Sequence, residues 1–285
     1  MDRREFLEAA GGGALARAMA AAAPARVIRK LDRIGLQLYT VRSRMEQPSA
    51  TGVEHTLERV ARIGYQEVQF AGYFGRTPRQ IRAALDAAGL TSPSAHVPLE
   101  LLREGWAEAL EAAHVMGHRY LLVAWTPVEE RQTLDGWRRI AHLFNRAADQ
   151  ARAAGILFAY HNHDFEFARL EGQIPFDVLL AEADADLVKI EMDLFWIIKG
   201  GGDPVAYFTR YPGRFHSVHV KDMDGQGRMV DVGQGTIDFA ATFARQDQAG
   251  IRHFFVEHDS PDDPFASIQR SYEYLRQLEF SAGPG

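Results

Sequence analysis

Polar residues that are costly to bury gather at four points in the second half of the chain, each directly after an apolar run. These points read Tyr160-His161-Asn162-His163-Asp164, Glu191-Met192-Asp193, His219-Val220-Lys221-Asp222 and Glu257-His258-Asp259. Buried ionised groups are stable only when they are paired with another charge or bound to a metal. Two imidazoles and two carboxylates that converge would suit a borderline or hard divalent cation.

The spacing within these four segments divides them into faces. Side chains at positions i and i+2 of a strand point to the same side. The pairs that share a face are His161 with His163, Glu191 with Asp193, His219 with Lys221, and Glu257 with Asp259. One inward residue from each of four strands would complete a four-ligand ring, and the spacing alone leaves open which member of each pair it is.

The elements that position these residues alternate between strands and helices from residue 33 onward. Hydrophobic patterning, N-cap residues and terminal glycines indicate each element. The expected strands are 35–41, 67–71, 92–97, 120–125, 156–161, 187–192, 214–220 and 253–257. The expected helices cover 53–63, about 78–88, 106–116, about 133–154, 174–182, a segment from Asp203-Pro204, 239–248 and 264–278.

Eight strand–helix units predict an α/β fold, a single-domain (β/α)₈ TIM barrel over residues 31–285, since such barrels use about 250 residues. A doubly wound sheet would carry a glycine-rich turn after its first strand, and the segment Leu38–Arg42 has none. Active sites of barrels lie at the carboxyl ends of the strands. The four polar segments occupy those positions, and earlier strands add Gln37, Tyr39 and His96.

Composition excludes several classes of protein. The chain has 285 residues, a formal net charge of −6 and no cysteine, so disulfides, thiolate metal sites and a cysteine nucleophile are excluded. A negative net charge argues against a nucleic-acid partner, because phosphate binding needs a basic surface. The sequence contains no uncharged apolar run of 18 residues, so we expect no membrane anchor. The expected partner is a small-molecule, sugar-like substrate, and a homo-oligomer is left open.

Residues 1–30 are expected to form a leader outside the barrel. Arg3-Arg4 precedes Phe6-Leu7 and a stretch rich in alanine and glycine, a pattern that resembles a twin-arginine export signal. Such a signal would carry the folded protein to the periplasm. The alternative is an alanine-rich segment of a cytoplasmic protein, because Glu8 and Arg17 interrupt the apolar region.

The segments YHNHDFEF, EMDLFW, VHVKD and FVEHD, in this order, resemble the xylose-isomerase-like superfamily of TIM barrels. This superfamily includes sugar isomerases and epimerases, inosose dehydratases and apurinic-endonuclease-like barrels. The resemblance covers residues 33–280. It implies one divalent cation held by His161, Asp193, His219 and Glu257. Many relatives carry a glutamate where this chain has His161, which puts epimerisation by two glutamates in doubt.

The resemblance also implies an activity. A divalent cation at a keto-sugar oxygen would acidify the neighbouring C–H by stabilising an enediolate, and side chains would then move the proton. We expect a sugar isomerase or epimerase; the alternatives are a lyase or hydratase that acts on 3-keto sugars and a non-catalytic sugar-binding barrel. The endonuclease-like alternative would need three zinc ions and a basic face. Mn²⁺ is the expected metal, and Co²⁺, Zn²⁺ or Mg²⁺ would also fit such ligands.

Individual roles follow from these positions. Glu257, His161 and Lys221 are expected to be catalytic, and Lys221 has the alternative of a salt bridge to Asp222 or Glu191. His163 competes with His161 as a metal ligand. The residues expected to bind substrate are His96, His163, Tyr39, Trp196 and Glu191.

Overall fold

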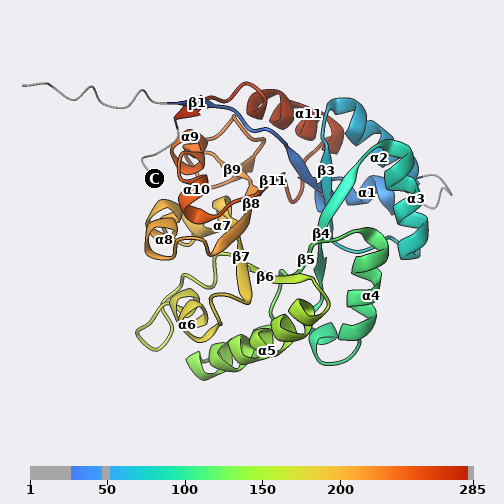
Figure 1. Cartoon of the computed structure of the whole chain (residues 1–285). Helices are drawn as coiled ribbons and strands as arrows, with labels where there is room; N and C mark the ends of the chain where they lie inside the picture. The colour runs from blue at the N-terminus through green and yellow to red at the C-terminus, as the bar shows by residue number, and fades with distance from the viewer. Residues whose placement is uncertain (1–26, 47–51, 282–285) are drawn as a thin grey trace, which may run out of the picture.

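The computed structural model describes residues 27–46 and 52–281, and it forms a closed barrel of eight parallel strands (Figure 1). The order around the barrel is β11-β2-β3-β4-β5-β6-β7-β8. This confirms the predicted (β/α)₈ fold. The barrel strands are β2 (Gly35–Gln37), β3 (Glu67–Phe70), β4 (Thr91–Val97), β5 (Tyr120–Val123), β6 (Leu157–His161), β7 (Val188–Asp193), β8 (Phe215–Val220) and β11 (His253–Val256).

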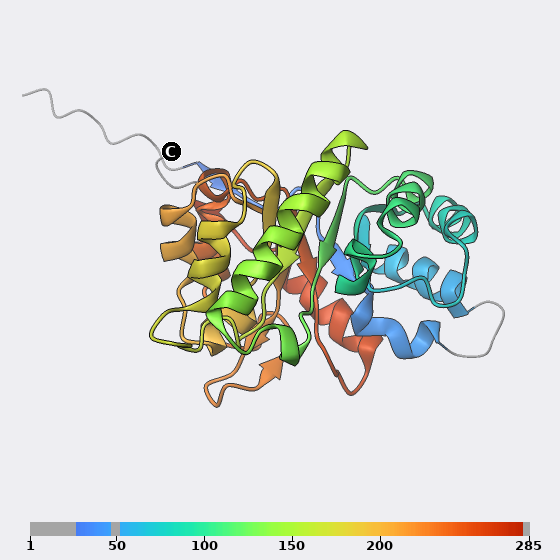
Figure 2. The ribbon, with the colours of Figure 1, turned by 90° about the horizontal axis from the view of Figure 1, so that it is seen from below.

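Helices surround the strands, and the long helix α5 lies across the outside of the barrel (Figure 2). The α-helices are α1 (Arg42–Met45), α2 (Gly52–Ile63), α3 (Pro78–Ala88), α4 (Trp106–Met116), α5 (Leu134–Ala153), α6 (Pro175–Glu182), α7 (Leu194–Lys199), α8 (Pro204–Arg210), α9 (Phe239–Phe243), α10 (Gln246–Ala249) and α11 (Pro264–Leu275). Three 3₁₀ helices, η1 (Leu38–Val41), η2 (Leu99–Leu102) and η3 (Val128–Glu130), lie in the loops after β2, β4 and β5.

Two short antiparallel pairs lie outside the barrel. They are β1 (Ile28–Arg29) with β12 (Phe280–Ser281), and β9 (Asp222–Met223) with β10 (Met229–Val230). Residues 1–26 of the predicted leader lie outside the described residues, whereas residues 28 and 29 belong to β1. Within 27–46 and 52–281, no helix is both long and apolar enough to cross a membrane.

Local sequence signals explain the helix boundaries. Thr77 and Gln80 form a capping box at the start of α3, with Pro78 as its first residue. This pair satisfies backbone N–H groups that a helix start leaves without partners. The helix ends at Gly89, whose φ of 69° lies in the left-handed region that glycine adopts without strain.

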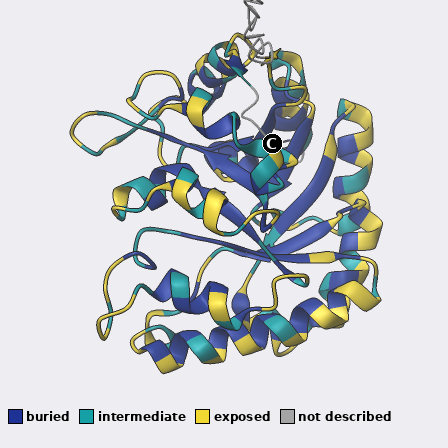
Figure 3. Cartoon of the chain, turned by 60° about the vertical axis from the view of Figure 1, so that its left-hand side comes forward, coloured by how far each residue is buried: buried dark blue, intermediate teal, exposed yellow. Residues whose placement is uncertain are grey.

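The strands are buried and the outer helix surfaces are exposed (Figure 3). Inside the barrel, Tyr120, Leu122, Ala159 and Phe255 form one apolar cluster. Gly35 permits close packing beside it, because a Cβ atom at this position would lie 2.5 Å from the Phe255 ring. The interior is therefore filled by side chains, as in other barrels of this size, and a ligand can enter only from an end.

The structure corrects some predicted boundaries. The first strand ends at Gln37 rather than residue 41, because the Gln37 side chain accepts a hydrogen bond from Tyr39 N and starts η1. The helix predicted over 239–248 is two short helices, α9 and α10. The predicted ends of β6 and β8, at His161 and Val220, are confirmed, so His163 and Lys221 lie beyond the strand ends.

Candidate metal centre and active-site cavity

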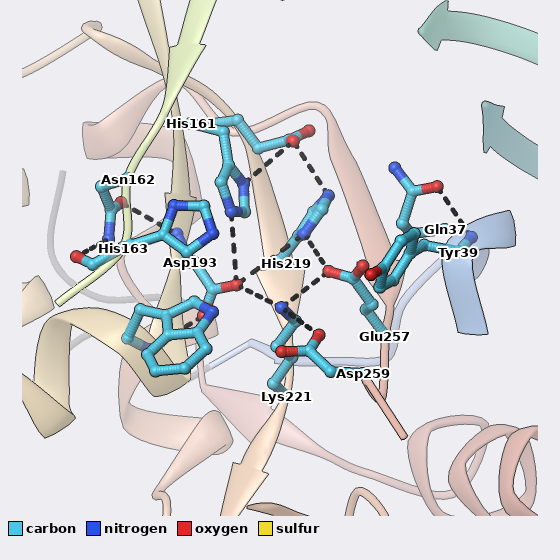
Figure 4. Close-up of polar contacts among 12 residues, drawn as sticks. Gln37, Tyr39, His161, Asn162, His163, Asp193, His219, Lys221, Glu257 and Asp259 are labelled. Atoms are coloured by element: carbon cyan, nitrogen blue, oxygen red, sulfur yellow. Dashed lines mark hydrogen bonds and ion pairs between the residues drawn. The ribbon is translucent and has the colours of Figure 1, made fainter. Parts of the chain in front are cut away.

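The four polar segments meet at the carboxyl ends of β6, β7, β8 and β11. His161, Asp193, His219 and Glu257 point toward one another there (Figure 4). Each of the four residues is at most 5% exposed. Adjacent parallel strands bring them together, because β6 pairs with β7, β7 with β8, and β8 with β11.

Three of these side chains offer atoms that lie close together. His219 Nδ1 lies 2.7 Å from Glu257 Oε2 and 3.8 Å from Asp193 Oδ2. His161 adjoins the group: its Nε2 lies 3.6 Å from Asp193 Oδ2, and its ring centroid lies 4.4 Å from that of His219. Asp193, His219 and Glu257 thus form a group that could hold a metal ion.

Unsatisfied buried atoms support this fit. Asp193 Oδ2 and His219 Nδ1 are buried and have no hydrogen-bond partner. The other carboxylate oxygen of Asp193 accepts a hydrogen bond from Trp196 N at the start of α7, which orients the group. The close contacts of the two unpartnered atoms are ion pairs, with Glu257 for His219 Nδ1 and with Lys221 for Asp193 Oδ2. A cation among these atoms would supply the directed bond that the buried atoms lack. Imidazole nitrogen and carboxylate oxygen are suitable donors for a divalent transition metal.

Lys221 lies against the same carboxylates. Its ammonium nitrogen is 3.1 Å from Asp193 Oδ2, 2.8 Å from Glu257 Oε2 and 2.8 Å from Asp259 Oδ1. The predicted alternative partners, Asp222 and Glu191, are not among these contacts. Asp222 instead accepts hydrogen bonds from loop N–H groups, including those of Gly233 and Gly235.

The charges of this cluster shift the pKa values of its members. Burial alone would lower the pKa of His219, but the carboxylates of Glu191 and Glu257 raise it to about 10. Burial raises the pKa of Asp193 to about 6, although Lys221 acts in the opposite direction. Burial would also raise the pKa of Glu257, yet Lys221 and His219 hold it well below its usual range. Glu257 is therefore a carboxylate near neutral pH, and His219 carries a proton on each nitrogen.

A cavity of about 350 Å³ opens directly above the cluster, and pockets of about this size hold small ligands. Tyr39 and Trp125 are 39% and 53% exposed, so both present aromatic surface at the mouth. The lining residues are Tyr39, Ala71, His96, Ala124, Trp125, His161, His163, Lys221, Glu257, Asp259 and Ser260.

The residues predicted to bind substrate divide into two groups. Tyr39, His96 and His163 line the cavity. Trp196 and Glu191 are not among its lining residues. The Trp196 ring lies 5.6 Å from that of His163, and Glu191 is completely buried below the cavity.

Several polar residues in the barrel interior were not predicted. Gln69, Ser94 and Ser217 are completely buried; Gln69 and Ser217 donate hydrogen bonds to Glu191, and Gln69 also donates to Ser94. The alternation of strand residues could have identified two of them, because Ser94 lies two positions before His96 and Ser217 two positions before His219.

Known proteins resemble this chain over most of its length. Inosose dehydratase of Lacticaseibacillus casei is 23% identical over 265 residues, which cover 78% of this chain and 88% of that protein. Inosose dehydratase of Geobacillus kaustophilus (strain HTA426) is 24% identical, with 79% and 87% covered. These names are those of enzymes, and the expectation that the chain is an enzyme is confirmed.

Solved structures agree with the fold. A sugar phosphate isomerase/epimerase from Parabacteroides distasonis ATCC 8503 superposes with a TM-score of 0.77 at 27% identity, covering 86% of this chain and 98% of that one. The family model for the xylose isomerase-like TIM barrel matches residues 57–278. The chain therefore belongs to the xylose isomerase-like TIM barrel family.

Proposed function

We propose that this protein is a divalent-metal-dependent enzyme that moves a proton at the carbon next to a carbonyl group of a sugar-like substrate. The observation that carries the proposal is the approach of Asp193 Oδ2, His219 Nδ1 and Glu257 Oε2 to one another, next to a cavity that Glu257 lines. His161 is the fourth proposed ligand. Mn²⁺ is our first choice, and Co²⁺, Zn²⁺ or Mg²⁺ would fit the same ligand types.

A divalent cation held by these residues would polarise a carbonyl oxygen and thereby acidify the adjacent C–H bond. Glu257 is the proposed proton acceptor, because it lines the cavity and remains ionised beside Lys221. Lys221 supplies a fixed positive charge. Burial would lower its pKa, but the carboxylates of Asp193, Glu257 and Asp259 raise it well above the usual value. Its ammonium group would donate a hydrogen bond to a substrate oxygen that gains negative charge.

The remaining polar groups of the cavity would orient the substrate. His163 is uncharged near neutral pH, because burial, with a further contribution from Lys221, lowers its pKa to about 3. Its Nδ1 atom is buried without a hydrogen-bond partner, so it would exchange a hydrogen bond with a substrate hydroxyl. Tyr39 and Trp125, which line the cavity, would supply aromatic surface for the C–H faces of the substrate.

Isomerisation or epimerisation is the first reaction we propose, in line with the structural relative of 27% identity. Loss of water from a 3-keto sugar or an inosose is the second. The observation that favours this lyase reaction is the pair of carboxylates that line the cavity, Glu257 and Asp259, both of which contact Lys221. His161 stands where many relatives have a glutamate, and the two carboxylates of the cavity both follow β11. Epimerisation by two glutamates on different strands therefore has one of its two groups replaced by an imidazole.

Proton-exchange NMR in D₂O with a panel of keto-sugars and inososes tests the proposal. Metal-loaded protein should exchange one carbon-bound proton for deuterium. Formation of an epimer or isomer would identify the first reaction, and an unsaturated product with loss of water the second. Binding of a panel member without any exchange or product, as expected for a sugar-binding barrel, would contradict both.

A further inference from the structure

Glu191 contacts two of the proposed metal ligands, His161 and His219. Its Oε1 atom is 2.9 Å from His219 Nε2 and 3.4 Å from His161 Nδ1. A third imidazole, that of His96, is 3.0 Å from the same oxygen. The carboxylate is completely buried, so these contacts are not screened by water.

The two ligand histidines use opposite ring nitrogens. His219 turns Nε2 toward Glu191 and Nδ1 toward Glu257 and Asp193. His161 turns Nδ1 toward Glu191 and Nε2 toward Asp193. The contact of His161 Nδ1 with Glu191 is an ion-pair contact without hydrogen-bond geometry. A negative charge or acceptor beside one nitrogen favours the proton there and leaves the lone pair of the other nitrogen available to a metal.

The surroundings of Glu191 hold it in this orientation. Its second oxygen, Oε2, accepts hydrogen bonds from Gln69 Nε2 and Ser217 Oγ, each 2.7 Å long. Gln69 Nε2 also donates to Ser94 Oγ, so Gln69 Oε1 remains the acceptor that lies 2.6 Å from His219 Nε2. His219 Nε2 therefore faces two acceptors, Gln69 Oε1 and Glu191 Oε1. Both lie on the Nε2 side of the ring, so neither competes with a cation for Nδ1.

From this arrangement we propose that Glu191 is a positioning residue that holds His161 and His219 with their outer nitrogens directed at the cation site. This inference rests on the proposed function, and it gives Glu191 a role other than the substrate contact expected from its sequence position. Groups of this kind behind metal-bound histidines typically change metal affinity by about 10- to 100-fold when they are replaced.

The same atoms allow a different arrangement. His96, His161, Glu191 and His219 offer ligand atoms close enough to hold an ion of their own. A second ion there would bind the ring nitrogens that face Glu191, while the first ion would bind the opposite nitrogens. Both imidazoles would then bridge the two ions. The second ion would also compete with Gln69 for His219 Nε2. The positioning role predicts one ion per chain, whereas a second site predicts two.

The test compares Glu191→Gln with Glu67→Gln in titrations of Mn²⁺ followed by calorimetry. Glu67 is a matched control, because it is also a buried barrel glutamate in contact with a histidine, His253, at 2.9 Å. Wild-type protein should bind one Mn²⁺. Glu191→Gln should bind it about 10- to 100-fold more weakly, and Glu67→Gln should match the wild type.

Histidine NMR gives a second readout that a purely structural role would not change. In Zn²⁺-loaded wild-type protein, long-range ¹H–¹⁵N spectra should show His219 protonated at Nε2 and His161 protonated at Nδ1. Glu191→Gln should alter these protonation patterns. If Glu191→Gln does not fold, Gln69→Leu removes the other acceptor of His219 Nε2 and should weaken Mn²⁺ binding about tenfold.

The outcomes separate the two proposals. Wild-type protein that binds no divalent cation would overturn the proposed function itself. Wild-type protein that binds one cation, together with a Glu191→Gln variant of equal affinity and unchanged histidine spectra, would overturn only the role of Glu191. Two ions per wild-type chain would overturn it in favour of the second site.

Discussion

The ammonium nitrogen of Lys221 lies 3.1 Å from Oδ2 of Asp193, in an ion pair that does not have hydrogen-bond geometry. Lys221 therefore supplies positive charge to a carboxylate that we propose as a metal ligand. The lysine and a divalent cation would act on the same oxygen, and Asp259 would remain as a partner of Lys221 when the cation is bound.

Replacing Lys221 by methionine should separate metal binding from catalysis. Mn²⁺ affinity should stay equal or increase, because a competing positive charge is removed, while kcat should fall by about 10²- to 10⁴-fold. The metal-free variant should lose about 3–5 kcal/mol of unfolding free energy, because buried carboxylates lose their partner. Calorimetric titration, steady-state kinetics and denaturant unfolding measure the three quantities.

Lys30→Met serves as the control for this variant. Lys30 is an exposed lysine whose ion pair with Glu279 is 3.4 Å long, and exposed pairs contribute about 0–1 kcal/mol. A Lys221→Met enzyme with wild-type kcat would contradict the catalytic role of Lys221.

Metal affinity should depend on pH through two groups. At pH 7 metal-free His219, with a pKa of about 10, carries an extra proton that metal binding must displace. Affinity should therefore rise about tenfold per pH unit between pH 6 and 10. Below pH 6 the dependence should become steeper, because Asp193, with a pKa of about 6, is then protonated as well.

Titration of Mn²⁺ between pH 5 and 8, in buffers of different ionisation enthalpy, measures both the affinity and the number of protons released. Release of about one proton per ion at pH 7 is the expected result. An affinity that does not change over this range would rule out His219 and Asp193 as ligands.

The barrel and its four polar segments could be predicted from sequence for physical reasons. Strand and helix periodicity, N-caps and terminal glycines determined the eight units, and polar residues after apolar strands indicated the carboxyl-terminal face. The end of β2 could not be predicted, because it depends on one hydrogen bond from Tyr39 N to the Gln37 side chain. The role of Glu191 depends on three-dimensional contacts with Gln69 and Ser217, which come from other strands.

Trp125 should contribute to substrate binding rather than to the chemical step. It is exposed at the cavity mouth, and its ring contacts His163 edge-on with centroids 5.3 Å apart. Trp125→Ala should raise KM about tenfold with little change in kcat, as expected when binding to substrate and transition state is lost equally. Val128→Ala is the control, since Val128 is exposed nearby and is not among the lining residues of the cavity. A fall in kcat at constant KM would assign Trp125 to the reaction instead.

The proposed export leader can be tested independently of the enzyme. Replacing Arg3 and Arg4 by lysine should keep the protein in the cytoplasm if residues 1–30 act as a twin-arginine signal. Fractionation of cells that express the full chain, with immunoblotting of each fraction, measures the distribution. Equal periplasmic amounts of the variant and the wild type would show that the arginine pair is not such a signal, as would a wild type confined to the cytoplasm.

The central claim is that one divalent cation binds among His161, Asp193, His219 and Glu257. The most direct measurement is an anomalous difference map from crystals grown with Mn²⁺, collected for the wild type and for His219→Ala. We predict one strong peak within ligand distance of these four side chains in the wild type and its loss in the variant. A wild-type map without a peak at this position, at saturating Mn²⁺, would contradict the claim.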